Sequence, residues 1–280
     1  MNSRHRRLVP ALVRIDAVAT GVQHVSPTSG VTTGRSQSAS RSRRTMTVLR
    51  RFLVLIPAHN EAQSLPSVIR ELQSIVPAAE LLVVDDGSTD GTWRLADSLG
   101  VRWLRLHERV GVGGAVRAGL RYAAKLGYKV VVRVDGDGQH HPEAIESLVA
   151  PILAGRADVI LGSRFTTGAG KRPGLVRRLL AWCLSQLTGR SVTDPTSGFC
   201  AFGARAVEML CEHHPTGYAE AELLLFSSRN GLRADEVPVR VRERVAGSTT
   251  LTPWRRVTAS ARIALAMVVV PLRAVVRNER

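Results

Sequence analysis

Three short apolar runs, each ending in a polar loop, are the feature of this sequence that most limits its fold. The runs are Phe52–Ile56, Leu81–Val84 and Val130–Val134. Segments with helical character follow the first two, predicted to run from about Ser64 to Ser74 and from near Trp93 onward. A continuous apolar run is typical of a parallel strand that is buried on both faces by helices. The sequence therefore predicts an α/β fold with a mostly parallel central sheet flanked by helices.

The third run leads directly into two carboxylates, Asp135 and Asp137, at the carboxyl end of a predicted strand. Open α/β sheets bind ligands at this end. Alternation along an extended segment would place both carboxylates on one side, and Gly136 between them would admit close backbone approach. Two carboxylates with Gln139 and His140 nearby suit a hard divalent cation that itself holds a diphosphate. The alternative is an ordinary strand-end turn, in which Asp and Gly are common.

A second acidic pair, Asp85-Asp86, closes the second apolar run. The pair could simply cap the following helix, because Asp is favoured at that position. It could also present carboxylates to a ribose or base, as an acidic residue does in dinucleotide-binding folds. Taken together with the loops that follow the other two strands, the pair favours the binding role.

Six motifs occur along the chain in an order that resembles family-2 glycosyltransferases. They are Pro57-Ala-His-Asn-Glu61, Asp85-Asp-Gly-Ser-Thr-Asp-Gly-Thr92, Gly111-Val-Gly-Gly-Ala-Val-Arg-Ala-Gly119, Asp135-Gly-Asp-Gly-Gln-His140, Gly162-Ser-Arg164 and Asp194-Pro-Thr-Ser-Gly-Phe199. The last two resemble the branch of dolichol-phosphate mannosyltransferase and bacterial polyprenyl-phosphate glycosyltransferases. The resemblance covers about residues 51–250. It implies a GT-A-type nucleotide-sugar-binding fold, a nucleoside-diphosphate sugar donor, Mg²⁺ or Mn²⁺, and a polyprenyl-phosphate acceptor.

On the donor side, the resemblance implies that Asp137 is the main metal ligand. Asp135 would contact the metal or the ribose, and Gln139 would supply a further oxygen. The residues expected to hold the nucleoside are Pro57, Asn60, Glu61 and Asp86. The glycines between 111 and 119 would let the following helix pack closely beneath the donor. Arg109 stands where many relatives have Asn.

On the acceptor side, a lipid phosphate is already an anion and needs little help from a general base. It needs cations that hold it in line with the anomeric carbon. The resemblance assigns this role to Arg164, to one of Arg177 and Arg178, and to Arg244. Asp194 is also expected in the site. It would be a general base for a hydroxyl acceptor, whereas for a phosphate acceptor it would orient the sugar or arginine side chains.

The loop that begins at Arg244 departs from the pattern of many relatives. They continue Arg-x-x-Gly-x-Ser-Lys, but this chain has Thr250 in place of the lysine. Without this lysine, the loop is not expected to make the same contacts with the donor diphosphate as in those relatives. Two other groups, His213-His214 and Glu220-Ala-Glu222, could suggest a second metal site. Adjacent residues diverge on a helix or a strand, so an ordinary helix end is the favoured explanation for the histidines.

The composition argues against nucleic acid as a partner. The formal net charge is +16, but the chain is rich in arginine and has only three lysines, Lys125, Lys129 and Lys171. Aromatic residues make up 4% of the chain and are not interleaved with basic ones, so platforms for stacking bases are not expected. Cys183, Cys200 and Cys211 lack a C-x-x-C spacing and are expected to be free thiols in a reducing cytoplasm.

The two ends differ in composition from the centre. Residues 1–45 contain eight Arg and one acid, and we predict a disordered basic extension, with Met46 as an alternative start. Residues 46–250 form the predicted catalytic domain, and residues 251–280 a basic amphipathic segment. Its apolar run, Ile263–Leu272, is about half the length needed to span a bilayer. It would lie in the headgroup layer or pack on the domain as a C-terminal helix.

Three classes of function follow from these features. The first, which we favour, is a metal-dependent inverting glycosyltransferase that acts on a polyprenyl phosphate. The second has the same fold but transfers to a soluble hydroxyl or glycan acceptor. The third is a non-catalytic nucleotide-sugar-binding protein. The intact acidic motifs argue against the third class, and Gly162-Ser-Arg164 with the basic C-terminal segment favours the first. We expect the protein in the cytoplasm, peripheral on the membrane or beside a small membrane partner.

Overall fold

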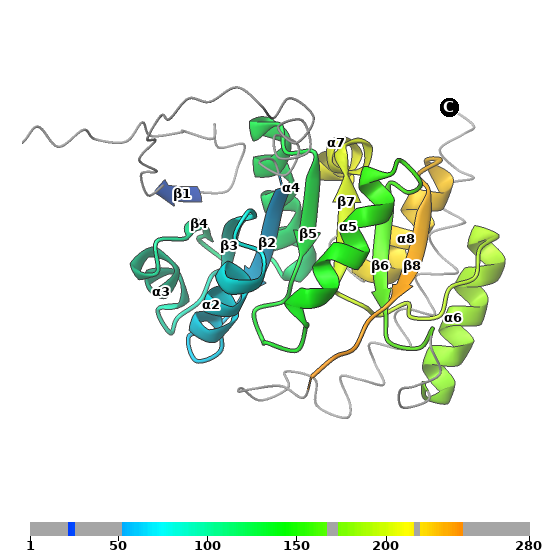
Figure 1. Cartoon of the computed structure of the whole chain (residues 1–280), viewed down its shortest axis with the longest axis horizontal. Helices are drawn as coiled ribbons and strands as arrows, with labels where there is room; N and C mark the ends of the chain where they lie inside the picture. Colours follow the sequence, from blue (N-terminus) through cyan, green and yellow to red (C-terminus); the bar gives the residue numbers. More distant parts are fainter. Residues whose placement is uncertain (1–21, 26–51, 167–172, 216–218, 243–280) are drawn as a thin grey trace, which may run out of the picture.

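The computed structural model describes residues 22–25, 52–166, 173–215 and 219–242 (Figure 1). The strands are β1 (Val22–Val25), β2 (Phe52–Ala58), β3 (Glu80–Asp86), β4 (Arg102–Leu106), β5 (Val130–Arg133), β6 (Val159–Ser163), β7 (Cys200–Gly203) and β8 (Ala234–Pro238). The helices are α2 (Leu65–Ile75), α3 (Thr92–Ser98), α4 (Val112–Leu126), the 3-10 turn η1 (Pro142–Ala144), α5 (Ile145–Leu153), α6 (Leu175–Thr188), α7 (Ala204–His213) and α8 (Ala219–Arg229). The predicted helices near 64–74 and 93 correspond to α2 and α3.

The strands form one mixed sheet in the order β1-β4-β3-β2-β5-β7-β6-β8. The pairs β2–β3, β2–β5, β3–β4 and β6–β8 are parallel, which confirms the predicted mostly parallel sheet. Strand β7 is antiparallel to both of its neighbours, β5 and β6. Its amino end therefore lies at the same edge as the carboxyl ends of β5 and β6. This brings the loop before β7 to the edge where the acidic loops are found.

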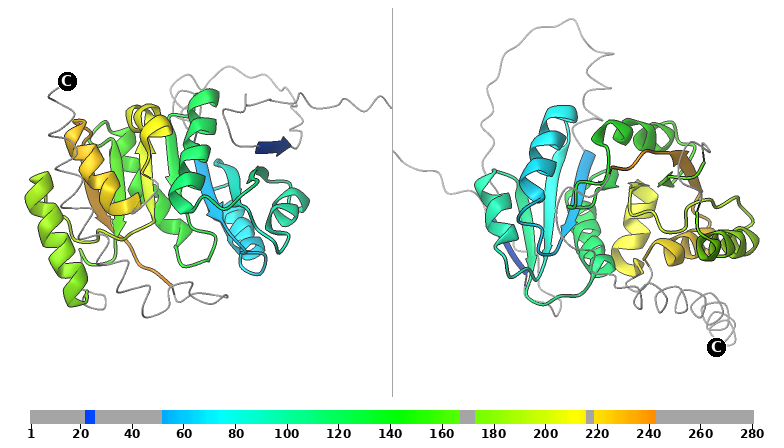
Figure 2. Two further views of the ribbon diagram at one scale, coloured as in Figure 1. Left: turned by 180° about the vertical axis from the view of Figure 1, so that it is seen from behind. Right: turned by 90° about the horizontal axis from the view of Figure 1, so that it is seen from below.

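Helices cover both faces of the sheet (Figure 2). The apolar side chains of α4, α7 and α8 form one core with one face of the sheet, and those of α2, α3 and α5 form the core on the other face. Helix α6 packs mainly on α8. A β-carbon at Gly119 of α4 would collide with Leu55 of β2, so this glycine permits the close packing of helix on sheet that its motif predicted.

Strand β1 lies within residues 1–45, for which the composition predicted disorder. Residues Val22–Val25 pair antiparallel with β4 at the edge of the sheet. A short valine-containing segment favours a strand, and the free edge of β4 offers it unpaired backbone groups. The rest of the predicted extension, the start at Met46 and the C-terminal segment 251–280 lie outside the described residues. In the described part of the chain, no helix is long and apolar enough to cross a membrane.

His214, at the end of α7, is buried and meets the ring of Phe202 edge-on. Burial lowers its pKa to about 4 from 6.5, with the charge of Arg133 acting in the same direction. Because the unfolded chain binds this proton more tightly, stability is full above about pH 6.5 and falls as the pH drops towards 4. The loss amounts to about 3 kcal/mol. We therefore expect His214→Leu to show a flatter dependence of melting temperature on pH between 6.5 and 4.

The neighbouring His213 provides a matched control for this prediction, because it is exposed. His213→Leu should retain the wild-type slope of melting temperature against pH. The same slope in both variants would show that His214 does not remain neutral in the folded protein.

Candidate active site

The polar loops predicted from the sequence meet at one edge of the sheet. The carboxyl ends of β2, β3, β5 and β6 lie at this edge because these strands run in the same direction. The right-hand view of Figure 2 looks at this edge from below. The amino end of β7 adds the loop that contains Asp194. The predicted donor-side and acceptor-side motifs therefore lie at the same edge of the sheet.

The loops after β2 and β3 are joined by hydrogen bonds around Asn60. Its backbone N–H donates to Ser88 Oγ at 2.9 Å, and its side-chain oxygen accepts from the backbone N–H of Thr89 at 2.9 Å. Asn60 has a φ of 56°, a left-handed conformation that Asn tolerates better than most residues. The next residue, Glu61, donates its N–H to Thr92 Oγ1 and accepts from Ser64 Oγ at 2.6 Å. Asn60 and Glu61 thus link the loops that follow β2 and β3, where the nucleoside is predicted to bind.

Asp86, expected to hold the nucleoside, is buried and organises a different loop. Its two carboxylate oxygens accept the backbone N–H groups of Val110 and Gly111 at 2.7 and 2.9 Å. These residues lead into α4, so Asp86 positions the start of that helix. The helix directly after the pair, α3, instead has Gly91 as its N-cap residue, and the preceding Asp90 accepts the backbone N–H of Thr92 at 3.0 Å. The simple capping alternative for the Asp85-Asp86 pair is therefore wrong.

Asp85 is completely buried and carries an oxygen with no hydrogen-bond partner among the described residues. That oxygen, Oδ2, lies 3.4 Å from Nε of Arg105 on β4. Burial raises the pKa of Asp85, against hydrogen bonds from Ser88 and the charge of Arg105. The guanidinium of Arg105 lies over the ring of Trp93 at 5.1 Å. Asp85 and Arg105 thus form an ion pair, buried on the Asp85 side, between β3 and the neighbouring β4.

The segment Asp135-Gly136-Asp137 does not continue the strand. Strand β5 ends at Arg133, and the chain then turns, with Gly138 at a φ of 76°. The expectation that strand alternation aligns the two carboxylates is therefore wrong, because alternation holds only within the strand. Asp137 Oδ1 instead accepts the backbone N–H of Gln139 at 3.0 Å.

Asp135 is held by a buried arginine that the sequence reasoning did not identify. Arg133 Nε donates to Asp135 Oδ1 at 3.0 Å, and its Nη1 donates to Glu220 Oε1 on α8 at 2.9 Å. Burial opposes the charge on Arg133, but the two carboxylates outweigh it and raise its pKa. A β-carbon at Gly198 would collide with both Asp135 and Arg133, so this glycine makes room for the pair. In the sequence, Arg133 is the one charged residue within the apolar run Val130–Val134, and this isolated charge could have indicated a buried ion pair.

His140 supports this turn. Its Nδ1 accepts the backbone N–H of Asp135 at 3.1 Å, so its proton resides on Nε2. The ring stacks on Phe199 at 4.6 Å, and burial lowers its pKa against the opposing charges of Asp135 and Asp137. With Nδ1 occupied and Nε2 protonated, His140 is a structural support rather than a metal ligand.

The described residues contain no cluster of three or more His, Cys, Asp or Glu side chains that could enclose a metal ion. Asp135 is paired with Arg133, whereas Asp137 accepts the backbone N–H of Gln139 through one oxygen. Gln139, two residues on, places its amide near Arg242, with Nε2 3.5 Å from the Arg242 carbonyl. One carboxylate and one amide oxygen fit a hard divalent ion if a bound diphosphate supplies the other oxygens.

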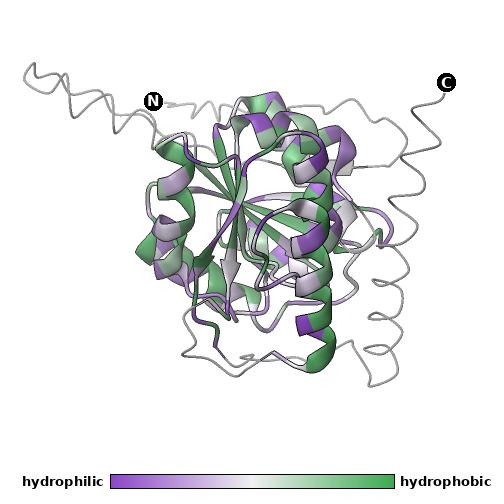
Figure 3. Ribbon diagram, turned by 90° about the vertical axis from the view of Figure 1, so that its right-hand side faces the viewer, coloured by the Kyte–Doolittle hydropathy of each residue, from purple (hydrophilic) through white to green (hydrophobic). Residues whose placement is uncertain are grey.

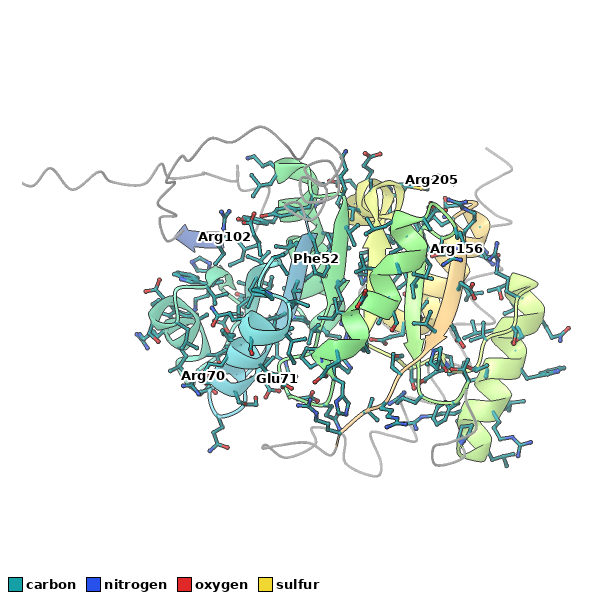
Figure 4. The ribbon with its side chains drawn as sticks, in the orientation of Figure 1. Phe52, Arg70, Glu71, Arg102, Arg156 and Arg205 are labelled. Carbon is teal, nitrogen blue, oxygen red and sulfur yellow. The ribbon has the colours of Figure 1, made fainter. Side chains whose placement is uncertain are left out.

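The chain after β8 is anchored beside Gln139. The backbone N–H of Arg242 donates to the Gln139 carbonyl at 2.9 Å, and its guanidinium binds Glu71 on α2 through two bonds of 2.9 and 2.6 Å. Figure 4 labels Glu71 on the lower part of α2, at the same end of the sheet as the polar loops. Arg244 lies outside the described residues. The described chain therefore ends at Arg242, held beside Gln139 and Glu71.

Arg164 and Asp194 form the centre of the predicted acceptor side. Arg164 Nε donates to Asp194 Oδ2 at 2.6 Å, and Nη2 donates to Oδ1 at 2.8 Å. Nη2 also donates to Thr196 Oγ1 at 2.8 Å. Asp194 is fully buried, which by itself would raise its pKa, but the hydrogen bonds and charge of Arg164 outweigh burial and lower it. With both oxygens engaged and the carboxylate ionised, Asp194 is arranged to orient Arg164.

A second acid that sequence reasoning missed supports this pair from β8. Glu236 accepts the backbone N–H groups of Thr193 and Asp194 at 3.0 and 3.2 Å. It lies more than forty residues along the chain, so no local motif connects it to Asp194. Arg177 and Arg178, also predicted for the acceptor, are exposed in the first turn of α6. Asp194, by contrast, is fully buried, and Arg164 is partly exposed.

The motif order and this geometry agree with comparisons to known proteins. Residues 53–208 match the family described as Glycosyl transferase family 2. The chain is 33% identical over 232 residues to the polyprenol monophosphomannose synthase of Mycolicibacterium smegmatis, covering 78% of this chain and 87% of the relative. It is 35% identical over 217 residues to the undecaprenyl-phosphate mannosyltransferase of Micrococcus luteus, covering 72% and 88%.

Solved structures agree with this assignment. One is the glucosyl-3-phosphoglycerate synthase of Mycobacterium tuberculosis in complex with Mn²⁺, uridine diphosphate and phosphoglyceric acid. It has a TM-score of 0.61 and 27% identity, covering 80% of this chain and 79% of that one. The predicted GT-A-type fold and the predicted enzyme class are both confirmed. The motifs, the sheet and these relatives together establish that the chain belongs to glycosyl transferase family 2 and is a glycosyltransferase.

Proposed function

We propose that this glycosyltransferase moves a sugar from a nucleoside-diphosphate donor to a polyprenyl phosphate, with inversion at the anomeric carbon and with the help of a divalent cation. The observation that carries the proposal is the Arg164–Asp194 pair. A site with its carboxylate fully occupied by an arginine suits an acceptor that is already an anion. The names of two relatives, polyprenol monophosphomannose synthase and undecaprenyl-phosphate mannosyltransferase, support the same class of acceptor.

Arg164 would bind the acceptor phosphate. Asp194 and Thr196 hold its Nε and Nη2, and its side chain is 26% exposed. The Nη1 end makes no hydrogen bond to the described residues and can donate to a phosphate oxygen. Held in this way, a phosphate oxygen can attack the anomeric carbon directly, and a single displacement of this kind inverts the configuration. Asp194 remains ionised throughout and keeps the guanidinium in position.

Asp137 would hold the divalent cation, with Gln139 as a supplementary oxygen ligand. When bound, the cation would stabilise the negative charge that develops on the departing diphosphate. Arg133 keeps Asp135 in place by pairing with it and with Glu220. Solved neighbours that hold Mn²⁺ together with uridine diphosphate support the use of a divalent cation by this fold.

A second candidate is transfer to a soluble acceptor. The observation in its favour is the similarity to glucosyl-3-phosphoglycerate synthase, whose structure holds phosphoglyceric acid. Phosphoglyceric acid also carries a phosphate, which Arg164 could bind. The group that would accept the sugar, however, is a hydroxyl, and its attack would benefit from a general base. The full engagement of Asp194 by Arg164 favours the first proposal.

A matched set of acceptors tests the proposal. Purified full-length protein is incubated with a panel of nucleoside-diphosphate sugars, Mg²⁺ or Mn²⁺, and a short-chain polyprenyl phosphate, the corresponding polyprenol or 3-phosphoglycerate. We expect transfer to the polyprenyl phosphate alone and loss of transfer in excess chelator. The anomeric configuration of the product, read by NMR, should be opposite to that of the donor. Transfer to polyprenol or 3-phosphoglycerate at an equal or higher rate would overturn the assignment of the acceptor.

The proposed acceptor is a membrane lipid. We also propose that the protein is peripheral on the cytoplasmic face of the membrane, where it would reach this acceptor.

A further inference from the structure

The four residues after β8, 239–242, cross the edge of the sheet at which the polar loops lie. β8 is the last strand of the sheet, separated from β5 by β6 and β7. Helices cover both faces, as Figure 3 shows from the β8 side of the molecule, so these residues pass the ends of the strands. In Figure 1 they run in orange from β8 past the lower ends of β6 and β5. The backbone N–H of Val239 donates to the Ser163 carbonyl at 2.8 Å, and Arg242 reaches the loop after β5.

The end of this segment pairs with the loop that carries Gln139. Val241 and His140 form an antiparallel bridge, and the backbone N–H of Arg242 donates to the Gln139 carbonyl at 2.9 Å. The Gln139 N–H in turn donates to Asp137 Oδ1 at 3.0 Å. Both backbone groups of Gln139 are thus engaged, one by Arg242 and the other by the carboxylate proposed to hold the cation.

The side chain of Gln139 is oriented by the same residue. Its Nε2 donates a long hydrogen bond, of 3.5 Å, to the carbonyl oxygen of Arg242. A carboxamide carries its nitrogen and its oxygen on the two arms of one carbon. With the nitrogen turned towards the Arg242 carbonyl, the oxygen faces away from it and is available to a hard divalent cation, which prefers oxygen ligands.

Arg242 is itself held by α2 and by the loop before η1. Its Nη1 and Nη2 donate to the two oxygens of Glu71 at 2.9 and 2.6 Å, and its Nε donates to His141 Nδ1 at 3.1 Å. Acceptance at Nδ1 requires a neutral imidazole whose proton is on Nε2. Glu143 lies 3.8 Å from Nη2 and adds a second negative charge. All three nitrogens of the guanidinium are therefore engaged.

This arrangement differs from an ordinary ion pair on the surface. The side chains of Arg242 and Glu71 are 31% and 30% exposed, and an exposed pair joined by one contact contributes little to stability. Two parallel bonds between a guanidinium and a carboxylate instead fix an orientation. The two residues are 171 positions apart, so their contact fastens the chain after β8 to the helix that follows the first donor motif.

We propose that Arg242 is a positioning residue for the divalent cation and that Glu71 acts through it. Arg242 holds the backbone and the side-chain amide of Gln139, and Glu71 keeps Arg242 in place. The inference rests on the proposed function, in which Asp137 and Gln139 hold the cation. Removal of a partner that orients a metal ligand typically costs about 10- to 100-fold in metal affinity.

Binding measurements test the inference without catalysis. The affinity of the full-length protein for Mn²⁺ is measured by titration calorimetry with uridine diphosphate and with guanosine diphosphate in turn, and with no acceptor. Glu71→Gln should bind Mn²⁺ about tenfold more weakly than wild type, and Arg242→Gln at least as weakly. The double variant should bind no more weakly than Arg242→Gln, because Glu71 acts only through Arg242.

Glu80→Gln is the matched control. Glu80, at the amino end of β3, pairs with Arg102 at 3.1 Å, and the two side chains are 41% and 30% exposed. Figure 4 labels Arg102 and Glu71 at opposite ends of the sheet. The control should lose a similar small amount of stability, measured as the melting temperature, but keep the wild-type affinity for Mn²⁺.

The kinetic parameters should divide in the same way. In Glu71→Gln the KM for the donor should rise at limiting Mn²⁺, while kcat/KM for the acceptor at saturating donor and Mn²⁺ changes much less. Wild-type Mn²⁺ affinity in Glu71→Gln and Arg242→Gln, with weaker binding in Asp137→Asn, would overturn the inference and leave the proposed cation site in place. Equal losses of affinity in Glu71→Gln and Glu80→Gln would show that the pair is only structural. Absence of Mn²⁺ binding by the wild type with either nucleotide would refute the cation site and the inference together.

Discussion

Replacing Asp137 by Asn is expected to reduce sugar transfer by a factor on the order of a hundred to a thousand, without unfolding the protein. The side chain keeps its shape, and Asn can still accept the backbone N–H of Gln139 that Asp137 Oδ1 accepts at 3.0 Å. What is lost is the negative charge available to a divalent cation. The measurements are the kcat at saturating Mn²⁺ and the affinity for Mn²⁺ in the presence of the nucleoside diphosphate.

Asp235→Asn is the matched control for this change. Asp235 also accepts a backbone N–H, that of Glu236 at 2.8 Å, but it is exposed on β8 and lies outside the proposed metal site. The control should have wild-type activity and wild-type Mn²⁺ affinity. Unchanged activity of Asp137→Asn, or full wild-type activity in excess chelator, would refute the role of Asp137 as a metal ligand.

The elements that the sequence predicted are those whose patterns are local. The runs at Phe52 and Leu81 are continuous because β2 and β3 are buried on both faces, and such runs leave little choice of structure. Helix α2 follows for the same reason, since its apolar spacing lies within one short window. These parts, and the class of the sheet, could be predicted without any knowledge of partners far along the chain.

The parts that could not be predicted depend on contacts between distant residues. Nothing local indicates that β7 inserts antiparallel between β5 and β6. The pair of Arg133 and Glu220 spans 87 positions. The direction of Asp137 depends on a turn that begins where β5 ends, and an apolar run does not mark that end.

The candidate site shows the same division. The motifs provided the candidate residues, but their resemblance to a family did not state which of them contact one another. The sequence left Asp194 with two roles, as a general base or as a residue that orients the sugar or arginine side chains. The two bonds from Arg164 favour the second role, since they occupy both carboxylate oxygens and lower the pKa of Asp194. The contact between Arg164 and Asp194 thus distinguishes the two roles of Asp194, which neither motif could do alone.

Replacing Arg164 by Lys is expected to lower kcat/KM for the polyprenyl phosphate by about a hundredfold, while kcat/KM for the donor falls much less. Lysine keeps the positive charge, so Asp194 remains paired. It cannot reproduce the fork in which Nε and Nη2 bind the two oxygens of Asp194 while Nη1 stays available to the acceptor. A single ammonium must therefore choose between the carboxylate and the acceptor phosphate.

The control is Arg233→Lys, because Arg233 forms the same kind of fork with Asp158, at 3.1 and 3.2 Å, on the outside of the molecule. It should change stability slightly and activity not at all. The pH dependence supplies a second readout. Because the pKa of Asp194 lies below the usual aspartate value of 3.8, the acid limb of the wild-type rate should not report this group near neutral pH. The wild-type rate could instead fall towards acid pH with a single carboxylate-like pKa above 3.8. If Asp194→Asn removed that pH dependence, Asp194 would act as a base. Arg164 would then position the Asp194 carboxylate rather than bind the acceptor phosphate. The acceptor would in that case be a hydroxyl group.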